Sequence, residues 1–274
     1  MQNDLQAELL PWRGPPEVLQ RLTRSGWLRS IHYCEQVDST NRLAKQMMLA
    51  GGAALPMLLV AKRQTAGRGR LGRTWYSDAG TLTITIAMSS EALRQPLARL
   101  SQLSLVTGLA LCDVVAEVID PVAVKLKWPN DVYVEGRKLA GILIESVGDR
   151  GEGIIIGIGL NVGTDFSKAP ADVQVRATAV SEFTKVPVPT FSLLPDLIDA
   201  LHARIVKWVD DPHATKQDYD AVCLLRGRRV SIAQGNLQIV GRCVGIDVDG
   251  QLRVDVDGDT VRVHSGEVLS WDGI

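Results

Sequence analysis

The sequence predicts a large α+β (mixed α/β) domain that carries a small β-barrel at its C-terminal end. One observation is that apolar runs of strand length, separated by turn residues, are concentrated before residue 162, and strong helical periodicity follows them. A second is a change in the sequence pattern at Arg226. After this residue, short runs in which apolar and polar residues alternate are joined by Asp249-Gly250 and Asp257-Gly258, pairs typical of hairpin turns. We therefore expect two domains, over residues 1–225 and 226–274.

Composition and charge argue against several classes of protein. With 274 residues and a net charge of -1, the chain has no overall positive field that would indicate nucleic-acid binding. We see no apolar run approaching the ~18 to 20 residues that cross a bilayer, and the first five residues lack the features of a secretory signal. The four cysteines are scattered singly, which favours buried free thiols over disulfides or a zinc site. We therefore expect a cytoplasmic protein without a membrane segment.

A polar quartet, Asp38-Ser39-Thr40-Asn41, separates a strand predicted over residues 30–37 from a helix that ends at Gly51-Gly52. Asp, Ser, Thr and Asn are all good N-cap residues, so we expect one of the four to cap this helix. Four such residues are more than a cap requires. The others are free to offer hydroxyl and amide groups to a small neutral polar ligand. Earlier in the chain, residues 15–26 predict one short helix.

The stretch from Gln64 to Trp75 sets arginines among glycines in the order Gly67-Arg68-Gly69-Arg70-Leu71-Gly72-Arg73. Glycines allow close backbone approach, and both backbone N–H groups and guanidinium groups bind phosphate or carboxylate oxygens. The glycines also fit the G-x-G-x-x-G spacing of dinucleotide-binding folds. That fingerprint leads into a helix, whereas the period-2 run over residues 81–86 predicts a strand. We interpret the stretch as a loop that wraps an anion; a solvated basic turn is the alternative.

Further strands are predicted beyond a long core helix over residues 96–119. Residues 125–134 predict two short strands interrupted by a turn, and a hairpin then leads into an apolar strand that begins near Lys138. A lysine at the mouth of a buried strand is either a functional cation or a side chain that snorkels to solvent. Residues 153–160 predict another buried strand, which is closed by Asn161. The glycines of this strand suit close approach of a ligand.

The remaining segment before the barrel is predicted to be helical only in its second half. Residues 163–189 have no clean period and contain prolines, so we expect an irregular segment there. Thr190 is expected to cap an amphipathic helix that runs to Trp208, and a shorter helix is expected over residues 214–224.

Five motifs together resemble bacterial biotin protein ligases in their order and approximate spacing. They are Asp38-Ser39-Thr40-Asn41, the stretch from Gln64 to Trp75, Lys127-Trp128-Pro129-Asn130-Asp131, Arg137-Lys138-Leu139-Ala140-Gly141-Ile142-Leu143, and Gly157-Ile158-Gly159-Leu160-Asn161. The resemblance covers residues 37–161 strongly and extends through the C-terminal barrel, which looks like the SH3-like domain of that family. Many relatives carry an N-terminal winged helix that makes them repressors of biotin synthesis. The first 30 residues offer one helix, so we expect the monofunctional type, which binds no operator DNA.

The resemblance implies an ATP-dependent ligase with two steps. Biotin is adenylated to biotinyl-5'-AMP with release of pyrophosphate, and biotin is then transferred to a lysine of a biotin carboxyl carrier protein. The carboxylate of biotin is itself the nucleophile, so the enzyme has to align it with the α-phosphate and stabilise charge in the transition state. Mg²⁺ is expected together with ATP, and the sequence assigns no protein ligand to it beyond a guess at Asp131.

The resemblance also implies which residues bind biotin. Ser39, Thr40 and Asn41, together with Gln64, would line the pocket for its ureido ring. Arg68, Gly69 and Arg70 would close over its carboxylate and over the phosphate of the adenylate.

For the nucleotide and the chemistry, the resemblance implies a smaller set. Arg73 would lie near the polyphosphate, and Lys138 would bridge carboxylate and α-phosphate oxygens, with Lys138 and Arg70 as the catalytic residues. Asn161 is a candidate contact either of the nucleotide or of the metal shell. Trp75 and Trp128 would either flank biotin or adenine or pack in the core.

Two alternatives stay open. A lipoate-protein ligase shares the fold type and the adenylate chemistry, but its pocket need not donate to a ureido ring, so Ser39, Thr40 and Gln64 favour biotin. A biotin-binding regulator without turnover is the other, and the expected lack of a DNA-binding module argues against it. The sequence leaves the oligomeric state open between monomer and homodimer.

Overall fold

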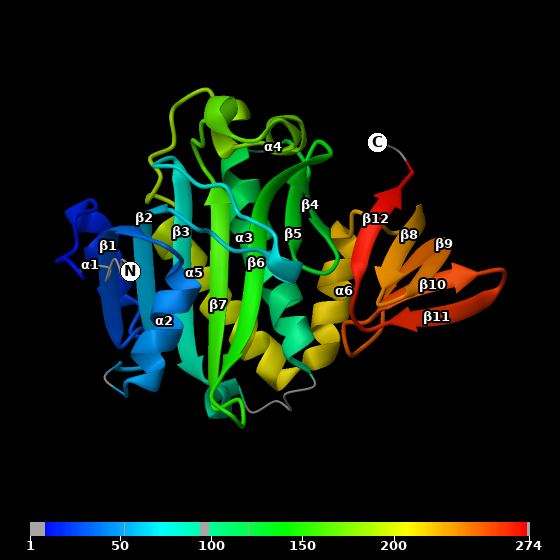
Figure 1. Cartoon of the computed structure of the whole chain (residues 1–274), viewed down its shortest axis with the longest axis horizontal. Helices are drawn as coiled ribbons and strands as arrows, with labels where there is room; N and C mark the ends of the chain where they lie inside the picture. The colour runs from blue at the N-terminus through cyan, green and yellow to red at the C-terminus, as the bar shows by residue number, and fades with distance from the viewer. Residues whose placement is uncertain (1–8, 52, 94–98, 120, 273–274) are drawn as a thin grey trace, which may run out of the picture.

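The computed structural model describes residues 9–51, 53–93, 99–119 and 121–272. Within these ranges, seven strands form one mixed sheet in the order β1-β2-β3-β7-β6-β5-β4, and five form a second, antiparallel sheet in the order β11-β10-β9-β8-β12 (Figure 1). These two sheets confirm the mixed α/β architecture with a C-terminal β-module. The first five residues, on which the expectation about a secretory signal depends, lie outside the described residues.

The large sheet contains one parallel pair, β1 with β2, and its other neighbours are antiparallel. Its strands are β1 (Ser30–Val37), β2 (Met57–Gln64), β3 (Thr81–Ser89), β4 (Val124–Lys127), β5 (Asp131–Val134), β6 (Arg137–Val147) and β7 (Gly153–Asn161). The strands predicted from apolar runs are all present. The tight β5–β6 turn is also present where it was expected. Its two central residues, Glu135 and Gly136, adopt positive φ angles, as a tight hairpin turn requires.

The central strand β7 gives the sheet two different faces. Because side chains alternate along a strand, Ile156 and Ile158 point to one face, where they join the main hydrophobic core with the long helices. Gly157 and Gly159 point to the opposite face. A methyl group on Gly157 would overlap the amide oxygen of Asn41, and one on Gly159 would overlap the indole ring of Trp75. The glycines therefore leave room above the sheet for functional side chains.

Helices cover both faces unequally. The core face is covered by α3 (Leu100–Ile119) and α5 (Leu194–Asp210), which pack on each other, while α2 (Thr40–Leu49) lies on the glycine face in front of the sheet (Figure 1). The described helices also include α1 (Pro16–Arg24), α4 (Ala171–Arg176) and α6 (Pro212–Val222). By length and composition alone, Ser101–Ile119 could cross a membrane, contrary to our estimate from the sequence. It is 78% buried inside the protein, as the core helix of a globular domain is.

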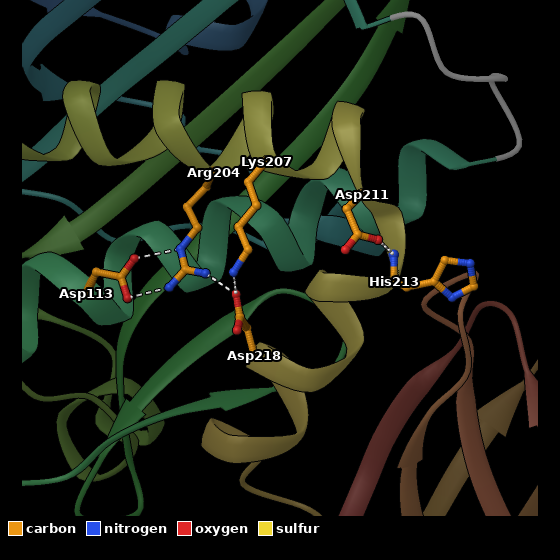
Figure 2. Close-up of polar contacts among 6 residues, drawn as sticks. All are labelled: Asp113, Arg204, Lys207, Asp211, His213 and Asp218. Atoms are coloured by element: carbon orange, nitrogen blue, oxygen red, sulfur yellow. Dashed lines mark hydrogen bonds and ion pairs between the residues drawn. The ribbon is translucent and has the colours of Figure 1, made fainter.

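An ion-pair network joins three of these helices on the core side (Figure 2). Arg204 of α5 donates two hydrogen bonds of 2.7 Å to Asp113 of α3 and also contacts Asp218 of α6. Lys207, one turn further along α5, lies 2.7 Å from Asp218. The network fixes α6, the last helix before the C-terminal sheet, against the main core.

The C-terminal sheet packs beside the β4–β5 end of the large sheet. Its strands are β8 (Arg229–Gln234), β9 (Leu237–Ile246), β10 (Leu252–Val256), β11 (Asp259–Val263) and β12 (Glu267–Trp271). The indole N–H of Trp128 donates to the carbonyl of Gly250 over 3.1 Å, and Tyr133 meets Trp271 edge to face. The five-stranded antiparallel sheet agrees with the expected SH3-like module, and these two contacts hold it against the β4–β5 hairpin. The domain division at residue 226 stays a prediction.

One predicted helix cap is correct in position only, and a second is wrong. Ser39 is the N-cap of α2 but makes no side-chain capping bond, and Thr190 donates to the carbonyl of Ala79 instead of capping α5. The Thr190 hydroxyl is thus occupied by a carbonyl outside α5, and at the start of α2 the backbone N–H of Thr40 donates to the side-chain oxygen of Gln64. The segment 163–189 is irregular as expected, although it contains the short helix α4. All four cysteines are buried and free, as predicted.

Candidate functional site

A pocket lies on the glycine face of the large sheet, between α2, the β4–β5 turn, the start of β6 and the C-terminal strand β12. The connection from β2 to β3 crosses the front of the sheet over it (Figure 1). The pocket is lined by the following residues that the sequence singled out: Ser39, Thr40, Asn41, Gln64, Arg68, Gly69, Arg70, Arg73, Trp75, Trp128, Asp131 and Lys138. Segments separated by more than 100 residues thus meet at one site.

At the α2 end of the pocket, Thr40 and Gln64 are held together. The backbone N–H and the hydroxyl of Thr40 both donate to the side-chain oxygen of Gln64, over 2.8 and 3.0 Å. This leaves the Gln64 amide nitrogen and the acceptor capacity of the Thr40 hydroxyl for a ligand. Ser39, beside them, is buried. The group combines donors and acceptors without charge, which suits a neutral polar ring.

Asn41 differs from its neighbours because protein groups occupy its amide. Its nitrogen donates to the carbonyl of Leu143 over 3.2 Å and to Glu145 over 2.8 Å, and its oxygen accepts from the Thr85 hydroxyl over 2.8 Å. Asn41 therefore connects α2 to two strands of the sheet, β6 and β3. Its contacts indicate that it fixes the pocket wall, whereas Thr40 and Gln64 keep free hydrogen-bonding groups.

The glycine-arginine loop is anchored by its arginines. Arg68 donates to Glu145 of β6 and Arg70 to the side-chain oxygen of Asn130, each over 3.3 Å. Burial lowers the pKa of Arg70, and the nearby charge of Asp131 opposes this shift. An arginine stays protonated under such conditions, so Arg70 contributes a partly desolvated cation to the pocket.

The third arginine of the loop reaches the other sheet. Arg73 forms an ion pair with Glu267 of β12, a pairing that joins the loop to the C-terminal module. Between the two anchors, Leu71 has a positive φ of 55° and is 74% exposed. The loop is thus tethered on both sides of an exposed apolar tip.

Lys138, at the start of β6, lies between a carboxylate and an aromatic ring. Its ammonium is 2.7 Å from Asp131 and 5.5 Å from the ring centre of Trp75. Both charged side chains are largely covered, with 30% and 18% exposed. The lysine is therefore held at the pocket wall by Asp131 and the Trp75 ring, and its role as a functional cation stays a prediction.

Lys127 is a candidate residue that sequence reasoning missed. Its ammonium lies 4.5 Å from the ring centre of Trp271 and 5.6 Å from that of Tyr133, and it donates to the carbonyl of Val268 over 3.5 Å. Burial lowers the pKa of Lys127 to about 8, with Asp131 acting in the opposite direction. The only signal in the sequence was its place in the Lys127–Asp131 motif, because the ring of Trp271 comes from the far end of the chain.

A second, larger cavity of about 610 Å³ opens next to this pocket and shares Lys127, Asp131 and Lys138 with it. Asn161 and Arg176 line only the second cavity. The amide of Asn161 donates to the carbonyl of Thr178 over 3.0 Å, so part of its hydrogen-bonding capacity is used within the protein. A volume of this size lies within the ~300 to 1,000 Å³ typical of ligand sites.

The described residues do not form a protein cage for a metal ion. Among residues 9–51, 53–93, 99–119 and 121–272, no three His, Cys, Asp or Glu side chains are grouped as metal ligands. Asp131, the residue guessed from the sequence, is ion-paired with Lys138. The site can instead concentrate positive charge, with guanidinium and ammonium groups around two adjoining cavities, opposite a neutral polar end. Such an arrangement suits the joining of two anions.

Comparisons with known proteins agree with this geometry. Residues 33–161 match the biotin/lipoate A/B protein ligase family, and residues 226–271 match the biotin protein ligase C-terminal domain. The chain is 36% identical over 248 residues to the biotin–(acetyl-CoA-carboxylase) ligase of Mycobacterium tuberculosis, covering 89% of this chain and 90% of that protein. It is 29% identical to the bifunctional ligase/repressor BirA of Escherichia coli, covering 87% of this chain and 73% of the relative.

A solved structure agrees over nearly its whole length. The biotin protein ligase of Aquifex aeolicus, in complex with biotin and ATP, matches with a TM-score of 0.77 at 28% identity, covering 89% of this chain and 99% of that one. Together with the 36% identity to the mycobacterial ligase, this shows that the chain belongs to the biotin protein ligase family.

Proposed function

We propose that this ligase adenylates biotin with ATP, releases pyrophosphate, and transfers biotin from biotinyl-5'-AMP to a lysine of a biotin carboxyl carrier protein. One observation carries the proposal: the cations of Lys138, Arg70 and Lys127 surround the same pocket whose other end is the neutral Thr40–Gln64 pair. A ligand with an uncharged polar ring at one end and a carboxylate at the other is complementary to this distribution of charge.

Biotin would bind with its ureido ring against Ser39, Thr40 and Gln64. Hydroxyl and amide groups provide both donors and acceptors there, and a ureido ring needs both. Its carboxylate would then extend toward Arg70 and Lys138. Arg68 and Gly69 would close over the bound molecule, while Asn41 would keep the wall in place through its bonds to β6 and Thr85.

ATP would occupy the second cavity, with its α-phosphate where the two cavities meet. Lys138 and Lys127 line both cavities and could therefore contact the reacting oxygens. Arg73 and Arg176 are available to the polyphosphate, and Asn161 stays a candidate nucleotide contact at the cavity wall.

For adenylation, a carboxylate oxygen of biotin attacks the α-phosphorus and pyrophosphate leaves. Both reactants are anions, so Lys138 and Arg70 would reduce their repulsion and stabilise the additional charge of the transition state. No side-chain nucleophile is required. In the second step, the amine of the carrier lysine attacks the acyl carbonyl and AMP leaves.

Mg²⁺ is expected to arrive with ATP, because this ion is commonly held by substrate phosphates and water with few protein ligands. We assign no step to it, since the described residues provide no metal cluster and Asp131 is engaged by Lys138. We further propose a cytoplasmic enzyme that is a monomer or homodimer and does not bind operator DNA.

The decisive test is biotin-dependent exchange of labelled pyrophosphate into ATP by the purified chain. We expect exchange with biotin to be far faster than with lipoate or octanoate. Equal or faster exchange with lipoate would favour the lipoate ligase alternative. Tight biotin binding without any exchange would favour a regulator without turnover.

A further inference from the structure

Strand β3 presents three threonines to the glycine face of the sheet. Thr81, Thr83 and Thr85 alternate along the strand and are paired across β7 with Asn161, Gly159 and Gly157. All three are at most 2% exposed. A buried hydroxyl normally finds a hydrogen-bond partner, because leaving it without one costs free energy.

Two of the three threonines have such partners. Thr81 lies 2.9 Å from the hydroxyl of Thr164, and Thr85 donates to Asn41 over 2.8 Å. The hydroxyl of Thr83 has no hydrogen-bond partner among the residues that the structure describes. Thr83 is also the member of the row that lines the pocket.

A second polar group without a partner lies at the same place. The indole nitrogen of Trp75 is buried and, within the described part of the chain, makes no hydrogen bond. A methyl group built on Gly159 would lie 2.5 Å from this nitrogen, and Gly159 is the cross-strand neighbour of Thr83. Two unsatisfied groups therefore lie near the same glycine, and both Thr83 and Trp75 line the pocket. A heteroatom of a bound ligand would satisfy them.

We propose that Thr83 is a substrate-recognition residue whose hydroxyl hydrogen-bonds to a heteroatom of the bicyclic ring of biotin, either in the ureido group or at the thioether sulfur. This inference rests on the proposed function. The ring is favoured over the carboxylate because Thr83 lies on β3, next to the strand that ends at Gln64. The cations Arg70 and Lys138, which suit the carboxylate, lie toward the β5–β6 end of the pocket.

The test is the substitution Thr83→Val, which keeps the shape of the side chain and removes the hydroxyl. Biotin affinity is measured by calorimetry, and the melting temperature is measured without ligand. We expect roughly 3- to 10-fold weaker biotin binding, as for the loss of one hydrogen bond. The melting temperature should stay equal or rise, since the substitution removes an unsatisfied buried group. Thr83→Ser keeps the hydroxyl and should bind biotin nearly as wild type does.

The matched control is Thr107→Val, in which the lost hydroxyl donates to Leu103 within α3. It should leave biotin affinity unchanged. Desthiobiotin, which has the ureido group but no sulfur, distinguishes the two contacts. If Thr83→Val binds both biotin and desthiobiotin more weakly than wild type does, the hydroxyl contacts the ureido group. If only the affinity for biotin falls, the hydroxyl contacts the sulfur.

Unchanged biotin affinity in Thr83→Val would overturn the inference, as would a lowered melting temperature with unchanged affinity, which indicates a purely structural role. Neither result would affect the proposed ligase activity. That activity fails only if the wild-type protein does not catalyse pyrophosphate exchange with biotin.

Discussion

The ammonium of Lys138 lies 2.7 Å from the carboxylate of Asp131, in a pocket wall where both side chains are largely covered. The pair holds the lysine in position before any substrate binds. A bound biotin carboxylate and an α-phosphate would offer the lysine further anionic partners, so it could stabilise the transition state without a large rearrangement.

Lys138→Ala should slow adenylate formation by roughly 10² to 10³-fold in a single-turnover assay, as the loss of a preorganised electrostatic contact typically does. Asp131 would lose its partner, so we also expect the free energy of unfolding to fall by about 1 to 3 kcal/mol. The control is Lys62→Ala, which removes a lysine from a more exposed ion pair with Glu35. An adenylation rate within about threefold of wild type would exclude the catalytic role.

Arg73→Ala tests whether the third arginine of the loop serves the polyphosphate. We expect the KM for ATP to rise roughly tenfold, the effect of one lost charge-assisted hydrogen bond, while biotin affinity stays nearly constant. Because Arg73 is 61% exposed, losing its pair with Glu267 should change stability by less than about 1 kcal/mol. Arg21→Ala, which breaks the exposed pair with Asp196, is the matched control. An unchanged KM for ATP would mean that Arg73 only tethers the loop to β12.

Arg204→Met tests the helix network on the opposite side of the sheet (Figure 2). It would leave Asp113 without the two hydrogen bonds from the guanidinium, whereas Asp218 would keep Lys207. We expect a loss of about 1 to 3 kcal/mol in urea unfolding and normal adenylation kinetics. Arg21→Met should cost less, because that pair is about half exposed on both sides.

The pH dependence of the same network has a definite sign. Burial raises the pKa of Asp218, but hydrogen bonding to Lys207 and the charge of Arg204 outweigh it, so the net pKa is lowered. A carboxyl whose pKa is lower in the folded state stabilises the fold above its unfolded pKa, and that stability is lost as the pH falls through its folded pKa. The stability difference between wild type and Arg204→Met should therefore shrink in acid. A constant difference from pH 6 to pH 3 would contradict the assignment.

The strands were predictable because their signal is local. The alternation of glycine and apolar residues in β7, and of threonine and apolar residues in β3, reports a two-sided strand directly. The helix caps were not predictable in this way. Ser39 stands at the N-cap of α2 but makes no capping bond. Thr190 bonds to Ala79, which is 111 residues away, so at Thr190 a distant partner overrides the local preference.

The candidate site was predictable only as far as its signal is local. The motifs gathered Thr40, Gln64, Arg70 and Lys138 correctly into one pocket. They could not separate Asn41, whose amide is occupied by groups on β3 and β6, from neighbours that keep free donors and acceptors. Which hydrogen bonds are already made depends on contacts between segments far apart in the chain, and composition and spacing carry no record of them.

Lys127 gives the last prediction. Its charged form is disfavoured by burial between Trp271 and Tyr133, which lowers its pKa from the usual 10.5 to about 8. The cation is therefore present at pH 7 and is lost as the pH rises through 8. If it contacts ATP phosphates, the KM for ATP should rise between pH 7 and 9 in the wild type. In Lys127→Met the KM should be high already at pH 7 and should not respond to pH through this group.

The fold should become more stable over the alkaline range in which ATP binding weakens. Between pH 8 and 10.5 the unfolded chain binds the Lys127 proton and the folded chain does not, so the free energy of unfolding should rise with pH relative to Lys127→Met. Lys125→Met, two residues earlier on β4, is the control for the effect on ATP and should leave the KM for ATP unchanged, because Lys125 lines neither cavity. A KM for ATP that changes equally with pH in the wild type and in Lys127→Met would assign the titration to another group and remove Lys127 from the nucleotide site.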